Sequence, residues 1–287
     1  MASRDVQRYY DLNTSVFLRI GSGGASHAIH RGLWPPGVRS NREAADHVNT
    51  LIADRIRNAL PRSPALILDL GCGVGGTLFS LAQTFPAARL HGITISARQV
   101  AIADGIAREK GIAQRCHFHQ GNFENLYLAL QADAIIAVES FIHSSSPERF
   151  FMTCHRHLAR GGVVIIVDDF LARPVPSLDP RAARLIEHFR QGWHVPGLCT
   201  VPDLDRVLEA TGFARLQDRD LSSMIRTHRP RDRLVALASH VAVALGLRRR
   251  PFWANVTGGH ALNRAIQSGW VQYRLLTLAR RVWGAPR

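Results

Sequence analysis

Short apolar runs alternate with stretches of helical periodicity along the middle of this chain. Five apolar runs are typical of buried strands, at 65–70, 89–94, 116–120, 133–138 and 162–168. Between them, apolar positions recur at helical spacing at 75–84, 97–110 and 147–158. Strands separated by helices predict a parallel sheet that carries helices on both faces.

Further elements flank this alternating region. A helical pattern at 41–60 precedes it, and a helix at 203–211 and extended runs at 213–221 and 270–279 follow it. The roughly 45 residues between the two extended runs are too long for a plain connection and contain apolar helical segments, so they predict an inserted cap. The chain therefore has the pattern of an α/β fold with a doubly wound, Rossmann-like sheet of seven strands. The expected division is an N-terminal helical segment at 1–60, a core at 61–221, a helical cap at 222–268, and the final strand and tail at 269–287.

The formal charge of +14 over 287 residues raises nucleic acid or an anionic membrane as a partner. Its distribution argues against both. Lys110 is the one lysine among 36 basic residues, and the arginines are scattered from Arg4 to Arg287. This bias is typical of a codon preference across a genome, although some arginines can hold an anionic substrate. We expect no nucleic-acid partner, and the 46% of apolar residues exclude a disordered chain.

Compartment is indicated by the cysteines and by the hydropathy of the chain. Cys72, Cys116, Cys154 and Cys199 form no C-x-x-C pair, which favours reduced thiols in the cytoplasm. The longest apolar stretch, at 234–247, is shorter than the roughly 20 residues that cross a bilayer. The first residues show no apolar signal core, so we expect no secretion.

The strongest local pattern is a buried strand, a glycine turn and a helix. Asp69 stands at the carboxyl end of the strand, and Gly71, Gly73 and Gly75 follow it, where a bare main chain lets a ligand approach closely. The same letters satisfy the dinucleotide fingerprint G-x-G-x-x-G. A nicotinamide site, however, needs a carboxylate about 20 residues further on, and the second strand ends at 91–96 without an acid. Asp69 before the glycines points instead to S-adenosylmethionine (SAM).

This turn resembles the first motif, D-x-G-x-G-x-G, of the class I SAM-dependent methyltransferases, in which the acid and the glycines hold the methionine part of the cofactor. The run from Gly92 to Gln99 resembles one branch, with cyclopropane fatty acid synthases, tocopherol methyltransferases and sterol or prenyl C-methyltransferases. There G-[IV]-[TN]-[LI]-S-x-x-Q replaces the usual ribose-binding acid, which implies ribose contacts from Thr94, Ser96 and Gln99. The structural alternative makes Ser96 a helix N-cap and Gln99 an exposed residue of the first turn.

The adenine site is implied by the segment after the third strand. Gln120 to Phe123 stands where the family has G-D-[FAV], so the resemblance implies adenine contacts from Asn122 and Phe123. Asn122 replaces the usual acid. Its amide oxygen can still accept a hydrogen bond from the adenine amino group.

The N-terminal segment matches the same branch. Residues 9–18 resemble its Y-D-x-[ST]-x-x-F/W opening, and 29–34 resemble the H-x-G-Y/W segment that follows. In those relatives this portion closes over the cofactor, which implies a lid and a cofactor contact from Tyr10. A hydrophobic helix staple is the alternative for Tyr9 and Tyr10.

The predicted catalytic groups follow the fourth strand, at the ligand-binding end of the sheet. Methyl transfer needs alignment and exclusion of water, and methylation of an alkene also forms a carbocation that needs stabilisation and a base. In the resembling branch an acid at this place acts as base or as electrostatic partner. We therefore assign Glu139 as the catalytic base and His143 as its partner or a second base. A structural salt bridge at Glu139, and a capping or core role for His143, are the alternatives.

The predicted reaction is SAM-dependent methylation of carbon in a small apolar, isoprenoid acceptor of secondary metabolism. The alternatives are an O- or N-methyltransferase of a natural product, an RNA methyltransferase and a noncatalytic cofactor-binding scaffold. If the acceptor carries a diphosphate, arginine forks would hold it, and the candidates are Arg31, Arg39, Arg173 and Arg226. The aromatic candidates for an apolar pocket wall are Trp34, Phe141, Trp193, Trp253 and Tyr273, and a place in the apolar core is the alternative for each. A homo-oligomer that exchanges the N-terminal segment is compatible with the sequence.

Two histidine pairs have i, i+2 spacing. His117 and His119 lie on a predicted strand, where that spacing places both on one face and is compatible with a metal. His155 and His157 lie on a predicted helix, where such residues diverge. With no third ligand evident, we predict no metal.

Overall fold

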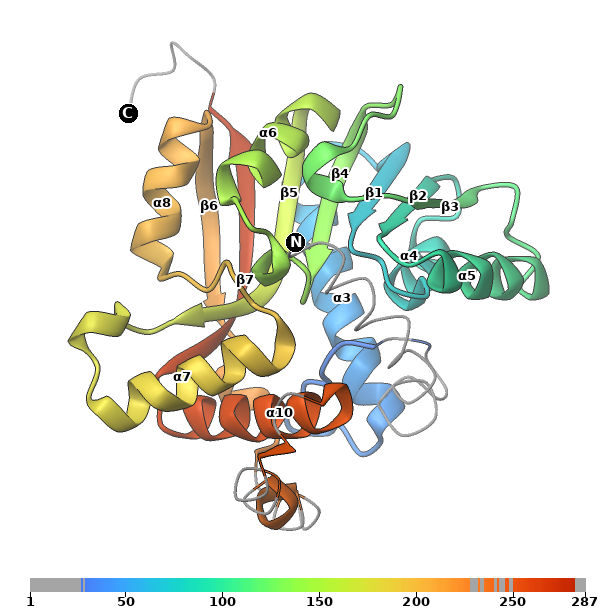
Figure 1. Ribbon diagram of the computed structural model, residues 1–287. Coiled ribbons are helices and arrows are strands. Elements are labelled where there is room, and N and C mark those ends of the chain that lie inside the picture. The colour runs from blue at the N-terminus through green and yellow to red at the C-terminus, as the bar shows by residue number, and fades with distance from the viewer. Residues whose placement is uncertain are drawn as a thin grey trace.

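A seven-stranded sheet organises the computed structural model, which describes residues 27, 29–227, 232, 235–239, 242, 246–247 and 250–281 (Figure 1). The strands, in the order β3-β2-β1-β4-β5-β7-β6, are Cys116–Gln120, Arg89–Thr94, Leu66–Leu70, Ala132–Val138, Leu158–Leu171, Val271–Arg280 and Phe213–Asp220. Strands β1 to β5 pair in parallel, and β7 runs antiparallel to both of its neighbours. The predicted doubly wound sheet of seven strands is confirmed.

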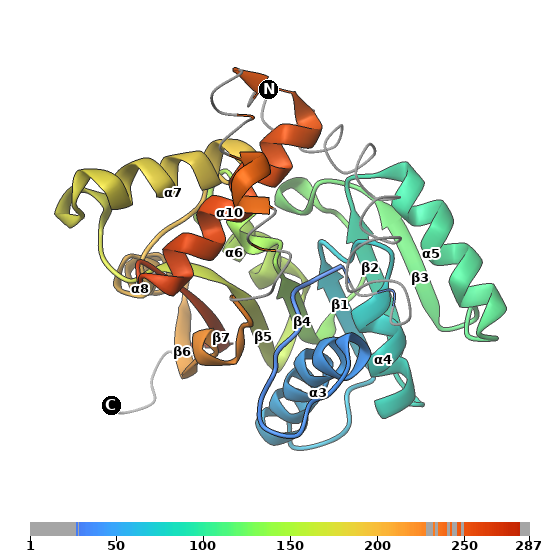
Figure 2. The same cartoon turned by 90° about the horizontal axis from the view of Figure 1, so that it is seen from below.

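Helices cover both faces of the sheet (Figure 1, Figure 2). Helices α3 (Asn41–Ala59), α4 (Gly76–Thr84) and α5 (Ala97–Glu109) pack on one face. Helices α6 (Pro147–His157) and α8 (Val201–Ala210) pack on the other. Because every residue of β1 is buried, this central strand has the continuous apolar sequence that two covered faces require.

The helix starts follow from local capping chemistry. Ser40 accepts a hydrogen bond from the amide of Glu43 at the start of α3, and Ser146 caps α6 in the same way. Thr200 accepts from the amide of Asp203 at the start of α8. Short 3-10 turns fill the connections: η1 (Phe123–Asn125), η2 (Phe141–His143), η3 (Val175–Ser177) and η4 (Ser222–Met224).

The cap consists of helices from two different connections. Helix α10 (Pro251–Gln267) precedes β7, and α7 (Pro180–Trp193) follows β5. The two lie side by side (Figure 1, Figure 2) and approach closely: a Cβ on Gly192 would stand 2.5 Å from the Ala254 carbonyl oxygen. The helix at 180–193 was not predicted from the sequence, although Asp179 before Pro180 is a typical helix start. The division at 60/61, 221/222 and 268/269 stays a prediction.

The apolar stretch at 234–247 lies only partly within the described residues. Within them, no helix has the length and apolar character that crossing a membrane requires.

Candidate active site

A pocket of about 1110 Å³, including its open mouth, lies at the carboxyl ends of β1, β2 and β4. This is where ligands bind in open parallel sheets. The predicted site residues that line it are Asp69, Gly71, Gly73, Thr94, Gln99, Asn122, Phe123, Glu139 and His143.

Two predicted cofactor residues, Ser96 and Gly75, are not among the described residues that line the pocket, and a third cannot be placed. Tyr10 lies outside the described residues. Ser96 is fully buried, and its hydroxyl accepts a hydrogen bond from the amide of Gln99 as the N-cap of α5, which is the structural alternative considered for it. Gly75 has a φ of +88° at the N-cap of α4, and a Cβ there would lie 2.8 Å from the Phe118 ring. Ser96 and Gly75 thus shape the site, and direct cofactor contacts from them stay predictions.

The glycine turn is fastened to the neighbouring strand. The amides of Gly71 and Cys72 both donate to the carbonyl oxygen of Ile93, each at 2.9 Å. Gly71 has a φ of +98°, and a Cβ on it would stand 2.3 Å from the Cβ of Ser140. Only glycine tolerates both the left-handed backbone and this close approach, so the motif is required by the fold as well as by a ligand.

Asp69 is a buried carboxyl group that has no counterion among the described residues. It is 2% exposed, and its Oδ1 has no hydrogen-bond partner among the described residues. Burial raises the pKa of Asp69 to about 8. A buried acceptor of this kind fits the ammonium group of SAM, which would supply both the missing hydrogen bond and the missing positive charge.

Thr94 and Gln99 form a neutral polar pair in the pocket wall. The Thr94 hydroxyl donates to Gln99 Oε1 at 2.5 Å. Gln99 is only 2% exposed, so the alternative of an exposed first-turn residue is wrong. Both residues line the pocket beside Gly121 and Asn122, and neither carries a charge, as the predicted ribose contact requires.

The predicted adenine segment forms turn η1. Asn122 caps this turn, since its Oδ1 accepts from the amide of Glu124 at 2.9 Å, and Phe123 packs edge-on against the Phe150 ring. Sequence reasoning missed Glu124. Its carboxylate accepts from the Ser144 hydroxyl at 2.8 Å and from the Ser145 amide at 2.5 Å, and so holds η1 against the loop after η2.

Glu139 directly follows β4 and lines the pocket in a constrained position. Its φ of +50° lies in the left-handed region, which is uncommon for a residue other than glycine and marks functional sites. Its amide donates to the Val167 carbonyl at 2.8 Å. Its Oε1 accepts from the Arg31 amide at 2.8 Å, from Arg31 Nε at 3.1 Å and from the Tyr273 hydroxyl at 2.9 Å. The salt bridge considered as an alternative is therefore present, and the carboxylate still faces the pocket.

The charge of Arg31 decides the state of Glu139. Burial alone would raise the pKa of Glu139, but the Arg31 cation, His30 and the hydrogen bonds from Arg31 together hold that pKa below its usual value. Arg31 also bonds Asp169 Oδ2 at 2.6 Å and lies 4.3 Å from the centre of the Tyr273 ring. Asp169 and Tyr273 were not predicted as partners of Glu139.

The proposed diphosphate forks and aromatic walls are not where they were expected. Arg31 is committed to two carboxylates, and Arg226 stacks on Trp34 at 3.6 Å from the ring centre. Of the candidate arginines, none is among the described residues that line the pocket, and the same holds for the aromatic candidates. Phe141 and Tyr273 are core residues, 1% and 0% exposed.

His143 lines the pocket from η2. Its Nδ1 lies 3.2 Å from the His194 carbonyl oxygen, so this nitrogen carries the proton of the neutral ring. Burial lowers the pKa of His143 to about 4. The imidazole is therefore neutral at pH 7.

The histidine pair on β3 has a third neighbour that the sequence did not reveal. His91 on β2 pairs with His117 on β3, and its Nδ1 lies 3.0 Å from Nε2 of His119, two residues further along the same face. The described residues nevertheless contain no group of three or more His, Cys, Asp or Glu side chains arranged to hold a metal ion. His157 is buried, with Nδ1 on the Thr153 carbonyl and Nε2 accepting from the Leu128 amide.

Comparison with known proteins gives matches in sequence. A methyltransferase domain family matches residues 67–162. An O-methyltransferase of Pyrenophora dematioidea is 30% identical over 226 residues, which are 77% of this chain and 80% of that protein. Norajmaline N-methyltransferase of Rauvolfia serpentina is 26% identical over 190 residues, 63% of this chain and 65% of that protein. Rice 24-methylenesterol C-methyltransferase 2 is 26% identical over 219 residues, 76% of this chain and 58% of that longer protein.

Solved structures match over nearly the whole chain. The crystal structure of the [4+2]-cyclase SpnF superposes with a TM-score of 0.75 at 28% identity, covering 98% of this chain and 96% of that one. A geranyl diphosphate methyltransferase, solved with geranyl diphosphate and sinefungin, superposes with a TM-score of 0.73 at 19% identity, covering 98% of this chain and all of that one. At that identity the second match speaks for the fold alone.

Proposed function

This chain belongs to the class I SAM-dependent methyltransferases, and we propose that it methylates a carbon atom of a small apolar, isoprenoid acceptor in secondary metabolism. The observation that carries this proposal is the Glu139 carboxylate, which lines the pocket and is held ionised by Arg31. The C-methyltransferases of sterols among the sequence relatives support it.

The cofactor half of the pocket would bind SAM through the residues described above. Asp69 would accept from the ammonium group, the glycine turn would lie along the methionine chain, and Thr94 with Gln99 would hydrogen-bond the ribose. Asn122 and Phe123 would border the adenine. Bound SAM supplies an electrophilic methyl group and leaves as a neutral thioether.

Glu139 has the properties that an alkene acceptor demands. When the π electrons of an alkene form the new carbon–carbon bond, positive charge develops on the neighbouring carbon, and a nearby carboxylate stabilises it. A proton next to a carbocation is strongly acidic, so a carboxylate of low pKa is a sufficient base to remove it and restore the double bond. Removal of a proton from a phenol or an ammonium group instead calls for a base whose pKa lies near the working pH.

The alternative is O- or N-methylation of a natural product. Its support is the 30% identical O-methyltransferase and the matched N-methyltransferase. His143 would then be the base, but its pKa of about 4 makes it a weak one. The lowered pKa values of both Glu139 and His143 therefore favour a carbon acceptor.

Methyl-labelled SAM tests the proposal directly. The purified protein is incubated with labelled SAM and two sets of acceptors, neutral prenylated aromatics or terpenes and prenyl diphosphates, and the products are analysed by mass spectrometry and NMR. Label on carbon supports the proposal, and the preferred set reports whether a diphosphate is recognised. Label confined to oxygen or nitrogen contradicts it. A rearranged product without added mass would instead match the kind of reaction named for SpnF.

A further inference from the structure

The side chain of Arg31 links the N-terminal segment to three strands. It bonds Glu139 after β4, bonds Asp169 on β5 at 2.6 Å, and covers the ring of Tyr273 on β7. Asp169 and Tyr273 are partners in the antiparallel pairing of β5 with β7, so their side chains rise from one face of the sheet. The side chain of Arg31 is 19% exposed, that of Glu139 is 15% exposed and that of Asp169 is fully buried. Because a buried Asp169 without a cation would be costly, this ion pair holds the Arg31 side chain in place.

Three donors converge on a single oxygen of Glu139. The Arg31 amide, Arg31 Nε and the Tyr273 hydroxyl all bond Oε1. The hydrogen bonds that the described residues donate to the Glu139 side chain all go to Oε1, which leaves the lone pairs of Oε2 unused. Since Glu139 lines the pocket, Oε2 is the oxygen that an acceptor meets. The network thus occupies the lone pairs of Oε1 and leaves those of Oε2 for a ligand in the pocket.

The same segment builds a wall of the pocket. Ile29 and His30 line it directly beside Arg31 in the chain. The segment is anchored next to them, where the Leu33 amide donates to the Ala44 carbonyl at 2.9 Å and the Trp34 amide donates to the Met224 carbonyl at 2.7 Å. The residues that form this wall and the cation that pairs with Glu139 therefore belong to one anchored segment.

From this arrangement we propose that Arg31 is a positioning residue, which couples the seating of the N-terminal wall to the ionisation and aim of the Glu139 carboxylate. The inference rests on the proposed catalytic part of Glu139, but not on the identity of the acceptor. It assigns to Arg31 a part different from the diphosphate fork that the sequence suggested.

Several ionisable groups face Glu139, and they define the expected changes. Arg31 and His30 come from the N-terminal segment, Asp168 and Asp169 from β5, Tyr273 from β7 and His143 from η2. Burial and the neighbouring Asp169 raise the pKa of Asp168 well above its usual value. Arg31 lowers the pKa of Glu139, and the Glu139 carboxylate raises the pKa of Asp169. Because repulsion between two carboxylates is mutual, Asp169 should in turn oppose the ionisation of Glu139.

The experiment follows the carboxyl signal of Glu139 by NMR in protein labelled with carboxyl-¹³C glutamate, with no acceptor present. The signal is assigned by its loss in Glu139→Gln, and its pKa is measured in four proteins: the parent, Arg31→Gln, Asp169→Asn and the control Arg215→Gln. We expect the Glu139 pKa to rise in Arg31→Gln, to fall in Asp169→Asn and to stay unchanged in Arg215→Gln. A general loss of structure cannot move one pKa in opposite directions in two variants.

Hydrogen exchange of the Arg31, Leu33 and Trp34 amides supplies the second readout. We expect faster exchange at all three in Arg31→Gln and unchanged exchange in Arg215→Gln. If Arg31→Gln folds and leaves both the Glu139 pKa and these exchange rates at the parental values, the proposal is overturned. If Arg31→Gln does not fold, a Glu139 pKa that fails to fall in Asp169→Asn overturns it.

These readouts separate this inference from the proposed function. Shifts as expected together with label on oxygen or nitrogen would keep the positioning part of Arg31 and remove the carbon acceptor. Parental pKa values together with label on carbon would do the reverse.

Discussion

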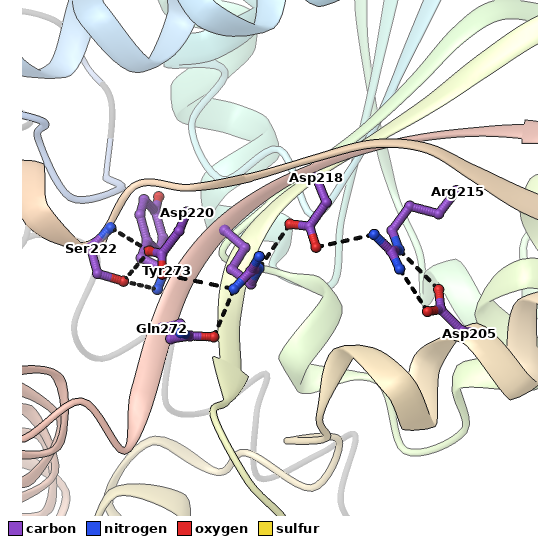
Figure 3. Close-up of polar contacts among 8 residues, drawn as sticks. Asp205, Arg215, Asp218, Asp220, Ser222, Gln272 and Tyr273 are labelled. Atoms are coloured by element: carbon purple, nitrogen blue, oxygen red, sulfur yellow. Dashed lines mark hydrogen bonds and ion pairs between the residues drawn. The ribbon is translucent and has the colours of Figure 1, made fainter.

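Two arginine–carboxylate networks meet at neighbouring residues of β7. Tyr273 points inward to Glu139 and Arg31, and the next residue, Arg274, points outward, where its Nε lies 2.8 Å from Asp218 Oδ1. Successive residues of a strand face opposite sides of a sheet, so one strand serves both networks. The outer network continues from Asp218 to Arg215 and on to Asp205, at 3.2 and 2.7 Å (Figure 3).

The two networks use the same chemistry under different exposure. In the inner one, Asp169 is fully buried, whereas Asp205 in the outer one is 40% exposed. Water screens the outer pairs, so they add little stability. In the inner pair, Asp169 has no contact with water, so without Arg31 it would be a buried unpaired charge. Burial, and not the number of contacts, therefore decides how much each ion pair contributes to stability.

Each network also has its own place in the sheet. The outer network lies on the edge strand β6, where charged side chains discourage pairing with another chain. The inner one lies between the N-terminal segment and the carboxylate that lines the pocket. Its position makes it part of the site.

The largest effect is expected from breaking the inner pair. Arg31→Met leaves Asp169 buried without its cation and should lower the free energy of unfolding by about 3–5 kcal/mol, measured by urea denaturation at pH 7. The double variant Arg31→Met/Asp169→Leu removes both charges and should recover most of that loss. A double variant as unstable as the single one would show that packing, and not the ion pair, sets the cost.

Activity provides the next test of the contrast. Glu139→Gln removes the charge that faces the acceptor and should lower kcat by about 100-fold or more, with the Kd for SAM unchanged. Asp218→Asn is the matched control, because Asp218 is likewise a carboxylate paired with arginine, here with Arg215 and Arg274, but lies in the outer network. Equal losses of kcat in both variants would contradict a special part for Glu139.

Asp69 is buried like Asp169, but no cation among the described residues pairs with it. Its folded pKa of about 8 lies above its unfolded value, so the folded protein holds this proton longer than the unfolded chain. Its contribution to stability is therefore greatest at low pH and is lost as pH rises toward 8, with a slope of about 1.4 kcal/mol per pH unit. Urea denaturation of the parent and of Asp69→Asn between pH 5 and pH 8 should differ by this slope.

Binding of SAM should displace the proton that Asp69 holds in the free protein. Below pH 8, uptake of a cationic ammonium group should ionise Asp69 and release a proton, which calorimetry in buffers of different ionisation enthalpy measures. Affinity for SAM should then rise with pH up to about 8. Asp69→Asn should release no proton, and proton release of the parental size in that variant would assign it to another group.

The smallest effect is expected in the outer network. Arg215→Gln should lower the free energy of unfolding by less than about 1 kcal/mol, and the loss should shrink in high salt because the pairs are partly exposed. Urea denaturation at low and high ionic strength measures it. A large loss that salt does not change would remove the contrast between the two networks.

The sequence carried those parts of the site that local chemistry defines. Asp69, the glycine turn, the Thr94 and Gln99 pair and Glu139 each stand at or just after the end of a strand, so their spacing along the chain placed them at one edge of the sheet. The missed α7 also had a local start signal at Asp179 and Pro180.

Only the tertiary structure decided what surrounds Glu139. Arg31 lies 108 residues before it and Tyr273 134 residues after it, while Arg31 and Asp169 are 138 residues apart. No local pattern joins such residues, because their meeting depends on the strand order β4-β5-β7 and on the antiparallel register of β5 with β7. The chain alone fixed the elements and the residues at their ends. Long-range pairing fixed which charges face one another, since burial and distance arise only once the sheet has formed.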